Sequence, residues 1–256
     1  MTMPTPAAIE SEVARHYAHG SLEQAILAAL AAAGKDPERL APLDLAAADE
    51  FHIGGLAATR AFAARLAFPA GAQVLDVGCG IGGPARVLAA EGGCRVTGID
   101  LTAEYVRVAE ALSRRVGLGD LTAFRQASAL ALPFADASFD GALMMHVGMN
   151  VEDKPRLMAE VRRVLRPGAL FGIYDVMRTA DGELAYPMPW AAGPATSFPA
   201  APAAYRRMLK AAGFKVVAER NRAAFAIAFF QESRAKAAAG GGPPPLGPHL
   251  VMGADV

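Results

Sequence analysis

The sequence predicts an α/β fold, with a Rossmann-like, mostly parallel sheet that carries helices on both faces and follows an N-terminal helical cap. Three observations predict it. The first seventy residues carry only helical patterns, the chain then alternates short apolar runs with helical patterns, and a glycine-rich turn follows the first of those runs. At 256 residues the chain can bury one sizeable core. We therefore expect a cap at 1–70 and a sheet domain at 71–256.

The cap is predicted from apolar residues spaced mostly by three and four over residues 7–33. Gly20 and Ser21 break this pattern and offer a new N-cap, so two helices are expected there. The sequence GKDP at 34–37 ends them, and a further helical stretch over 43–68 is interrupted at the sequence FHIGG.

Six strands are predicted from short apolar runs at 73–78, 95–100, 121–127, 139–145, 170–176 and 214–220. Helices are expected between them at 84–91, 102–116, 153–166 and 202–212. The third of these helices is expected to be closed by Arg166, Pro167 and Gly168, with Gly168 as its C′ residue. In such a sheet the carboxyl ends of the strands form the edge at which ligands bind.

Two segments fall outside this alternation. Residues 177–202 contain five prolines together with Tyr186, Trp190 and Phe198, and are too apolar for a plain linker. A long, proline-stiffened aromatic loop inside a compact domain is typical of a lid over a small-molecule pocket. The low-complexity sequence at 237–250 is expected to be a mobile connector.

Composition narrows the class of protein. Lys plus Arg and Asp plus Glu each total 25, so no basic field is available for nucleic acid. The start has no basic region followed by an apolar stretch, and no apolar run approaches the length that spans a bilayer. Cys79 and Cys94 lie outside any zinc-ligand spacing. We therefore expect a cytoplasmic monomer or homodimer, with no membrane or nucleic-acid partner, no metal, and reduced, structural cysteines.

The glycine-rich turn, within VLDVGCGIGGPARVLA at 74–89, indicates which ligand the sheet holds. The spacing of its glycines fits a dinucleotide fingerprint, and Asp100 stands where that fingerprint has a ribose-binding acid. Asp76, however, places an acid in the strand, and Pro84 removes a backbone N–H that a pyrophosphate would use. A ligand with a cationic end and no phosphate fits better, and S-adenosylmethionine has an ammonium and a sulfonium group.

Four stretches together resemble the class I S-adenosylmethionine-dependent methyltransferases: LDVGCGIGG (75–83), VTGIDLT (96–102), LALPFADASFDGALMMHV (130–147) and RVLRPGALFGIYD (163–175). This resemblance implies S-adenosylmethionine as cofactor and S-adenosylhomocysteine as product. It implies that the methionyl part is lined by Gly78, Gly80 and Gly82, beside Asp76. It also implies that Asp100 takes the ribose hydroxyls and that the adenine lies against Leu101, Ala127, Ser128 and Ala129.

One position departs from that family. Many relatives carry Asp where this chain has Ser128, so the adenine amine is expected to meet a hydroxyl or a backbone carbonyl instead. After the run at 214–220 there is also no clear last strand of the family's usual antiparallel hairpin.

A narrower resemblance is carried by DEFHIGGLAATRAFA (49–63), HVGMNVEDK (146–154) and AYPMPWA (185–191). These stretches look like the branch of small-amine methyltransferases related to sarcosine, dimethylglycine and phosphoethanolamine N-methylation.

Methyl transfer to an amine needs alignment, exclusion of water and removal of a proton from the alkylammonium. His146 is the candidate base, because it follows the fourth strand at the ligand-binding edge. It could instead only pack on the cofactor. Asn150 could orient a substrate group or simply cap a helix. In the cap, Tyr17, His52 and His16 are expected to close over the cofactor or to serve packing alone.

Three residues near the expected lid are candidates for the acceptor. Tyr186 and Trp190 could form an aromatic face for a cation, or simply close the lid. Arg178 could pair with a substrate carboxylate or with a structural acid.

Three functions fit the sequence. The first is N-methylation of a small-molecule amine by in-line transfer. The second is O- or C-methylation of a phenolic or quinone-like metabolite, which an apolar lid fits equally well. The third is a non-catalytic scaffold that binds S-adenosylmethionine, which the departure at Ser128 leaves open.

Overall fold

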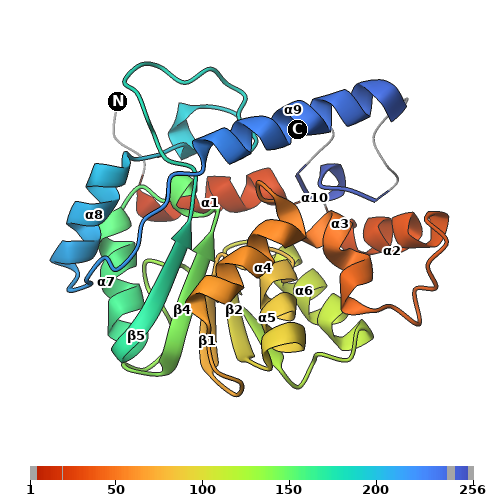
Figure 1. The fold of residues 1–256 in the computed structure, drawn as a ribbon, viewed down its shortest axis with the longest axis horizontal. Coiled ribbons are helices and arrows are strands. Elements are labelled where there is room, and N and C mark those ends of the chain that lie inside the picture. Colours follow the sequence, from red (N-terminus) through yellow and green to blue (C-terminus); the bar gives the residue numbers. More distant parts are fainter. Residues whose placement is uncertain (1–4, 19, 241–245, 253–256) are drawn as a thin grey trace.

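Five parallel strands form the centre of the molecule in the order β3-β2-β1-β4-β5, as the fold prediction requires. The structure is a computed structural model and describes residues 5–18, 20–240 and 246–252. The strands are β1 (Gln73–Val77), β2 (Arg95–Asp100), β3 (Thr122–Gln126), β4 (Phe139–Met145) and β5 (Leu165–Tyr174). Because all five are parallel, their carboxyl ends meet at one edge of the sheet (Figure 1).

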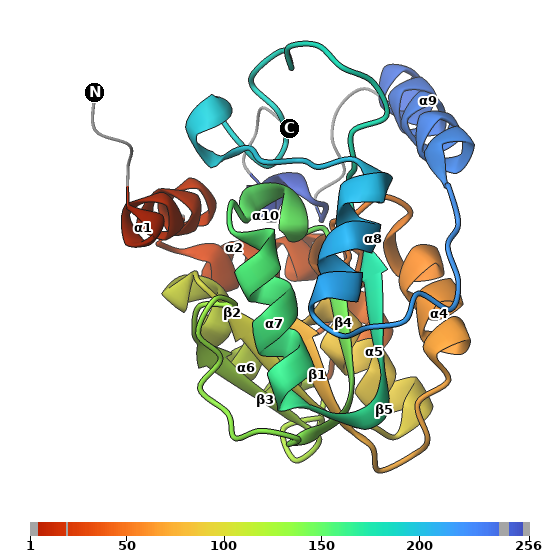
Figure 2. The same cartoon turned by 90° about the vertical axis from the view of Figure 1, so that its left-hand side faces the viewer.

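Helices cover both faces of this sheet, and each face has its own apolar core. The first core packs side chains of α4 (Gly55–Leu66), α5 (Gly83–Gly92) and α6 (Ala103–Arg115) against alternate strand residues such as Val74 and Val96. The second packs α7 (Lys154–Val164) and α8 (Pro202–Ala211) against Leu75, Val77 and Met144 (Figure 2). The alternation of Val74 and Leu75 between the two cores follows from the two-residue period of a strand.

The remaining N-terminal elements lie over the carboxyl edge of the sheet. They are α1 (Pro6–Tyr17), α2 (Leu22–Ala32), the 3₁₀ turn η1 (Pro42–Leu45) and α3 (Ala46–Asp49). A third apolar cluster joins Leu22, Ile26 and Leu30 of α2 to Leu112 of α6. Figure 1 shows α1 passing across the ends of the strands. In contrast, α4 packs directly on β5 and α5, so the last part of the predicted cap belongs to the layer that covers the sheet.

A buried ion pair attaches this cap to the sheet domain. The guanidinium of Arg86 on α5 donates to the Asp49 carboxylate over 2.7 Å, and both side chains are almost fully buried. Arg86 also donates to the carbonyls of Ile81 and Ala109 and to the Ser113 hydroxyl. Such a charge is tolerated in the interior because both terminal nitrogens of the guanidinium find acceptors, although Nε has no partner among the described residues.

The expected lid segment has little regular structure. Between β5 and α8 the chain forms only the 3₁₀ turn η3 (Pro194–Thr196) and an isolated bridge between Met188 and Ala191. This segment passes above the carboxyl edge of the sheet, on the same side as α1 (Figure 2).

Two sequence predictions about chain geometry are wrong. The run at 214–220 forms no strand: Val217 is 73% exposed and the segment pairs with no described strand, because only Phe214 reaches the second core. Gly168 is not a helix C′ residue, since α7 ends at Val164 with Leu165 as its C-cap. Gly168 instead has φ +79° within the irregular start of β5, where the register with β4 shifts.

The end of the chain also differs from the expected connector. A helix, α9 (Ala223–Gly240), follows the run at 214–220, and α10 (His249–Met252) packs back on the cap. Val251 is fully buried there, and its carbonyl accepts a hydrogen bond of 2.7 Å from the Tyr105 hydroxyl. Residues 241–245 of the predicted connector lie outside the described part. None of the described helices combines the length and apolar character needed to cross a bilayer.

Candidate active site

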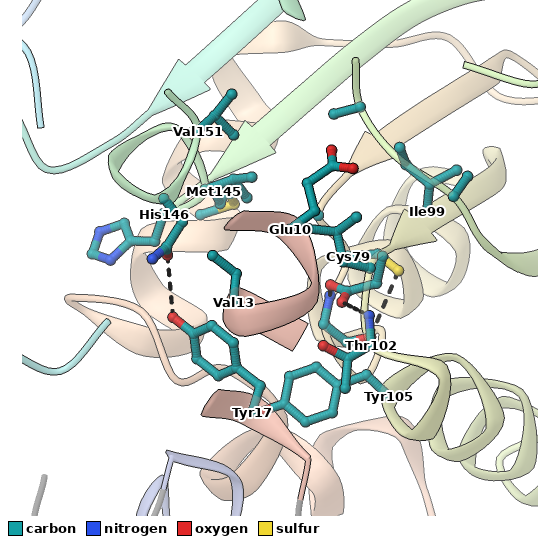
Figure 3. A pocket seen from close by; sticks show the side chains of 18 of the residues that line it. Glu10, Val13, Tyr17, Cys79, Ile99, Thr102, Tyr105, Met145, His146 and Val151 are labelled. Atoms are coloured by element: carbon teal, nitrogen blue, oxygen red, sulfur yellow. Dashed lines mark hydrogen bonds between the residues drawn. The ribbon is translucent and has the colours of Figure 1, made fainter. Parts of the chain in front are cut away.

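A cavity lies at the carboxyl edge of the sheet, between α1 and the turns that follow β1, β2 and β4. Figure 3 shows Glu10, Val13 and Tyr17 projecting from α1 between His146 on one side and Thr102 on the other. Eleven of the candidate site residues line this cavity: Tyr17, His52, Asp76, Gly78, Gly80, Asp100, Leu101, Ala127, Ala129, His146 and Asn150. The fold thus brings together residues that are spread over more than half of the chain.

The glycine-rich turn is shaped by close contacts as well as by backbone angles. Gly78 and Gly80 have φ of +71° and +53°, which side chains other than glycine rarely adopt. A Cβ atom at Gly80 would lie 2.7 Å from the Phe51 ring, and one at Gly78 would lie 2.3 Å from a Val147 methyl group. Phe51 and Val147 therefore pack closely against the turn, and only glycine leaves room for them.

Asp100 closes this turn from the end of β2. Its two carboxylate oxygens accept the backbone N–H groups of Gly80 at 3.0 Å and Thr102 at 2.9 Å. Burial raises the pKa of Asp100, while these two hydrogen bonds act in the opposite direction. Each carboxylate oxygen can accept more than one hydrogen bond, so Asp100 keeps capacity for a pair of ligand hydroxyls.

Asp76 places a deeply buried carboxylate beside the glycine-rich turn. The residue is 1% exposed, it lines the cavity, and its Oδ2 has no hydrogen-bond partner in the part of the chain that the structure describes. Burial, followed by the negative charge of Asp100, raises the pKa of Asp76 to about 7. A buried, unpaired carboxylate is costly unless a cation or donor meets it. The residues present therefore fit the ammonium end of S-adenosylmethionine at Asp76 and its ribose at Asp100.

The loop expected beside the adenine is present, with one difference. Ala127 and Ala129 line the cavity, whereas Ser128 does not. The Ser128 hydroxyl donates to the Glu10 carboxylate of α1 and accepts the Leu130 N–H at 3.0 Å. This hydroxyl therefore holds α1 in place. Gly82 lies outside the lining too. It is the N-cap of α5, with φ +87°, and a Cβ atom there would lie 2.8 Å from the Phe124 ring.

His146 stands at the end of β4 in an unusual backbone conformation. Its φ is +56°, and its N–H donates to the Tyr174 carbonyl at 2.8 Å. Its ring lies 5.2 Å from that of Tyr174 and 5.9 Å from that of His52, centroid to centroid. Burial, and then the charge of His52, lowers the pKa of His146 to about 3, so the imidazole is neutral at physiological pH.

A buried polar cluster supports the neighbouring His52. The Thr59 hydroxyl donates to Glu50 Oε2 at 2.5 Å and lies 3.0 Å from His52 Nε2. Burial, followed by the charge of Asp49, raises the pKa of Glu50 to about 8, and burial lowers the pKa of His52 to about 4. The cluster fixes the His52 ring in its neutral form against His146.

Asn150 joins α1 to the loop that precedes α8. It lies at the end of the 3₁₀ turn η2 (Gly148–Asn150), and its Oδ1 accepts the Tyr17 hydroxyl at 3.2 Å. Its Nδ2 donates to the carbonyls of Trp190 at 2.8 Å and Thr196 at 2.9 Å. The amide oxygen and nitrogen of Asn150 are thus both used within the protein. Asn150 does not cap the following helix, since the N-cap of α7 is Asp153.

Four other candidates lie outside the lining of the cavity. The Trp190 indole donates to the Ser197 hydroxyl at 3.0 Å, and the Arg178 guanidinium donates to the Gly182 carbonyl, so both are used within the loop itself. Tyr186 precedes a cis proline and is half-buried. His16 Nε2 lies 3.4 Å from the Pro189 carbonyl and so adds a second contact between α1 and the loop.

Several lining residues were not predicted from the sequence. Glu10, Ile9 and Val13 of α1 face the cavity, although their spacing indicated only an amphipathic helix. Phe51 and Glu152 also line it. The sequence FHIGG held a signal for Phe51, since it interrupts a helix with an aromatic residue, but no local pattern indicates that α1 lies over the sheet.

Comparison with known proteins agrees with this geometry. A sequence profile described as a methyltransferase domain matches residues 75–173. Sterol 24-C-methyltransferase ERG6B of Gibberella zeae is 38% identical over 109 residues, which cover 43% of this chain and 29% of that protein. The chain thus spans less than a third of the length of that relative.

Two solved structures show the same fold. The [4+2]-cyclase SpnF has a TM-score of 0.58 at 26% identity, over 78% of this chain and 73% of that one. Phosphoethanolamine N-methyltransferase 2 of Haemonchus contortus, solved in complex with S-adenosyl-L-methionine, has a TM-score of 0.65 at 22% identity, over 74% of this chain and 44% of that one. Residues 75–173 therefore match a methyltransferase domain, and the parallel sheet that they form has the same fold as these two structures.

Proposed function

We propose that this protein is an S-adenosylmethionine-dependent methyltransferase that acts on a small molecule. The observation that carries the proposal is the unpaired carboxylate of Asp76, which lines the same cavity as Asp100 and the glycine-rich turn. An ammonium group at Asp76 and a ribose at Asp100 would satisfy both acids at once. This pairing favours S-adenosylmethionine over a dinucleotide, whose pyrophosphate would lie at the glycine-rich turn beside the Asp76 carboxylate.

The cofactor supplies a methyl group that its sulfonium charge already activates. The protein's own residues then have to align the acceptor and exclude water. In this chain α1 covers the cavity, and Asn150 ties α1 to the loop above the sheet. Alignment of this kind can contribute on the order of 7–11 kcal/mol to lowering a barrier.

The acceptor we favour is an amine, with His146 beside its nitrogen. Since the imidazole is neutral at physiological pH, its free nitrogen can accept a hydrogen bond from an N–H of the acceptor. The phosphoethanolamine N-methyltransferase with the same fold supports this direction, as do the three stretches that resemble amine methyltransferases.

O- or C-methylation is the second candidate. The cavity has Val13, Val147, Val151 and Met145 in its lining, and these apolar side chains suit an apolar acceptor. A sterol C-methyltransferase among the relatives agrees with an apolar acceptor. A cyclase has the same fold, so the fold by itself does not establish methyl transfer.

Transfer of radiolabelled methyl groups from S-adenosylmethionine to panels of amines, phenols and quinols tests the proposal. We expect labelled product from at least one amine, and a His146→Asn variant that binds S-adenosylhomocysteine normally but turns over more slowly. Transfer to phenols or quinols alone would support the second candidate. Tight cofactor binding with no transfer to any acceptor would contradict the enzyme and support a scaffold.

A further inference from the structure

The charges that line the cavity all have one sign. Six acidic side chains line it: Glu10, Asp49, Asp76, Asp100, Glu152 and Asp153. Within the described residues no lysine or arginine lines it, and its two histidines, His52 and His146, are both held neutral by burial. The cavity is therefore an acidic compartment with largely apolar walls.

Only part of this negative charge is neutralised by the protein. Asp49 pairs with Arg86, and the raised pKa of Asp76 leaves it partly protonated near neutral pH. No ion pair within 4.0 Å joins any of the other four carboxylates to a basic side chain of the described part. Bound S-adenosylmethionine brings a net charge of only about +1, since its carboxylate offsets its ammonium.

The basic residues near this region are already committed elsewhere. The Lys154 ammonium donates to the Val151 carbonyl at 2.6 Å and to the Phe198 carbonyl, and burial lowers its pKa to about 8. Arg178 donates to Gly182, and Arg86 is used between the cap and α5. None of the three lines the cavity.

Sites that bind carboxylate or phosphate groups supply arginine, lysine or a set of N–H donors. Once Asp76 and Asp100 face the cofactor, an anionic acceptor would still lie near the half-buried Glu10 and the more exposed Glu152 and Asp153. No basic side chain of the described residues lines the cavity to offset the repulsion between like charges. We infer that the acceptor is a neutral or cationic, mainly apolar molecule and that the site excludes acceptors with a carboxylate or phosphate group. This inference rests on the proposed function.

This inference separates the chain from part of the group that it resembles. Phosphoethanolamine, sarcosine and dimethylglycine each carry an anionic group, and Arg178, which the sequence offered as a partner for a carboxylate, points its guanidinium at its own loop. The likeness in fold to a phosphoethanolamine N-methyltransferase therefore does not extend to the charge of the acceptor.

Matched ligands that differ by one anionic group test the inference. The protein is first saturated with S-adenosylhomocysteine, and failure of that step would count against the proposed function alone. Binding is then measured for tyramine against tyrosine, and for N-phenyl-1-naphthylamine against its sulfonate, 1-anilinonaphthalene-8-sulfonate. We expect the member without the anion to bind at least tenfold more tightly in at least one pair, and the anion to bind more tightly in neither.

Two variants assign the discrimination to the cavity. Glu10→Gln keeps the size of a lining side chain and removes one charge, and it should reduce the ratio of affinities within a pair about threefold or more. Glu12→Gln is the matched control, because Glu12 is exposed on the same helix and does not line the cavity. The inference is overturned if the anionic member binds equally well or better, if no member of either pair binds, or if both variants change the ratio equally.

Discussion

The Tyr17 hydroxyl donates a hydrogen bond to Asn150 Oδ1 over 3.2 Å, although 133 residues separate the two in sequence. The same Asn150 amide donates to the carbonyls of Trp190 and Thr196 in the loop before α8. One side chain thus connects the helix that covers the cavity to the loop above the sheet. Of these two elements, α1 lines the cavity, whereas no described residue of the loop does.

Asn150→Ala should loosen both elements. The variant loses three hydrogen bonds, two of them to carbonyls of the loop, and should lose about 2–3 kcal/mol of unfolding free energy. We expect faster hydrogen exchange at residues 186–198 and in α1, and a KM for the acceptor about tenfold higher. Asn221→Ala is the control, since Asn221 only caps the exposed start of α9. Equal effects of the two substitutions on exchange at 186–198 would contradict the connection.

Asp76→Asn should make the cofactor-free protein more stable and unable to bind its cofactor. The folded-state pKa of Asp76 is raised from 3.8 to about 7, so the wild-type protein loses stability as the pH rises from about 4 to about 7. The variant does not carry this loss, which is on the order of 4 kcal/mol at pH 8. Its Tm should exceed that of the wild type by several degrees at pH 8 and by little at pH 4. A less stable variant that still binds S-adenosylhomocysteine would contradict this role for Asp76.

His146 should contribute an acid-sensitive part of the stability. Its folded-state pKa of about 3 lies below the ordinary value of 6.5, so its contribution is complete above pH 6.5 and declines as the pH falls toward 3. Urea unfolding of wild type and His146→Asn should diverge below pH 6, with the wild type losing about 1 kcal/mol more per pH unit. Asparagine tolerates the positive φ at this position, so backbone strain does not confound the comparison. Parallel pH dependences would show that His146 is not held neutral.

Thr59→Val removes the hydroxyl that joins Glu50 to His52 with little change in shape. Glu50 Oε1 has no partner among the described residues, and Oε2 would then keep only the His52 Nε2 at 3.6 Å, so the expected cost is about 2–3 kcal/mol of unfolding free energy. Since His52 packs against His146, kcat/KM should also fall. Thr122→Val is the control: Thr122 loses one buried hydrogen bond, to the Leu118 carbonyl, far from the cavity. A Thr59→Val protein with normal stability and turnover would show that the cluster is not needed.

Much of the sheet could be predicted because its signals are local. The first five strands alternate between two cores with a period of two, and the glycine-rich turn needs positive φ angles that glycine adopts freely. Asp76 and Asp100 could be placed at the site because each lies in or ends a strand next to that turn. Their pairing across the turn follows from the parallel register of β1 and β2.

The rest depended on contacts between distant segments. The spacing of Ile9 and Val13 indicates an amphipathic helix but not which surface it covers, and here that surface is the cavity. The run at 214–220 has the composition of a strand, yet it lies beside no strand with which to pair. Trp190 and Arg178 were candidates for binding the acceptor, but they donate hydrogen bonds to Ser197 and Gly182 of their own loop. The conformation of this irregular loop, and hence these bonds, has no signature in the sequence.

The central claim is that Asp100 and the glycine-rich turn hold S-adenosylmethionine, and titration calorimetry with S-adenosylhomocysteine on wild-type protein and on Asp100→Ala tests it most directly. We expect a wild-type Kd in the micromolar range, roughly −7 to −9 kcal/mol, and affinity at least a hundredfold weaker in the variant. Unchanged affinity in Asp100→Ala, or a wild type that binds NADH tightly and neither adenosyl ligand, would contradict the account.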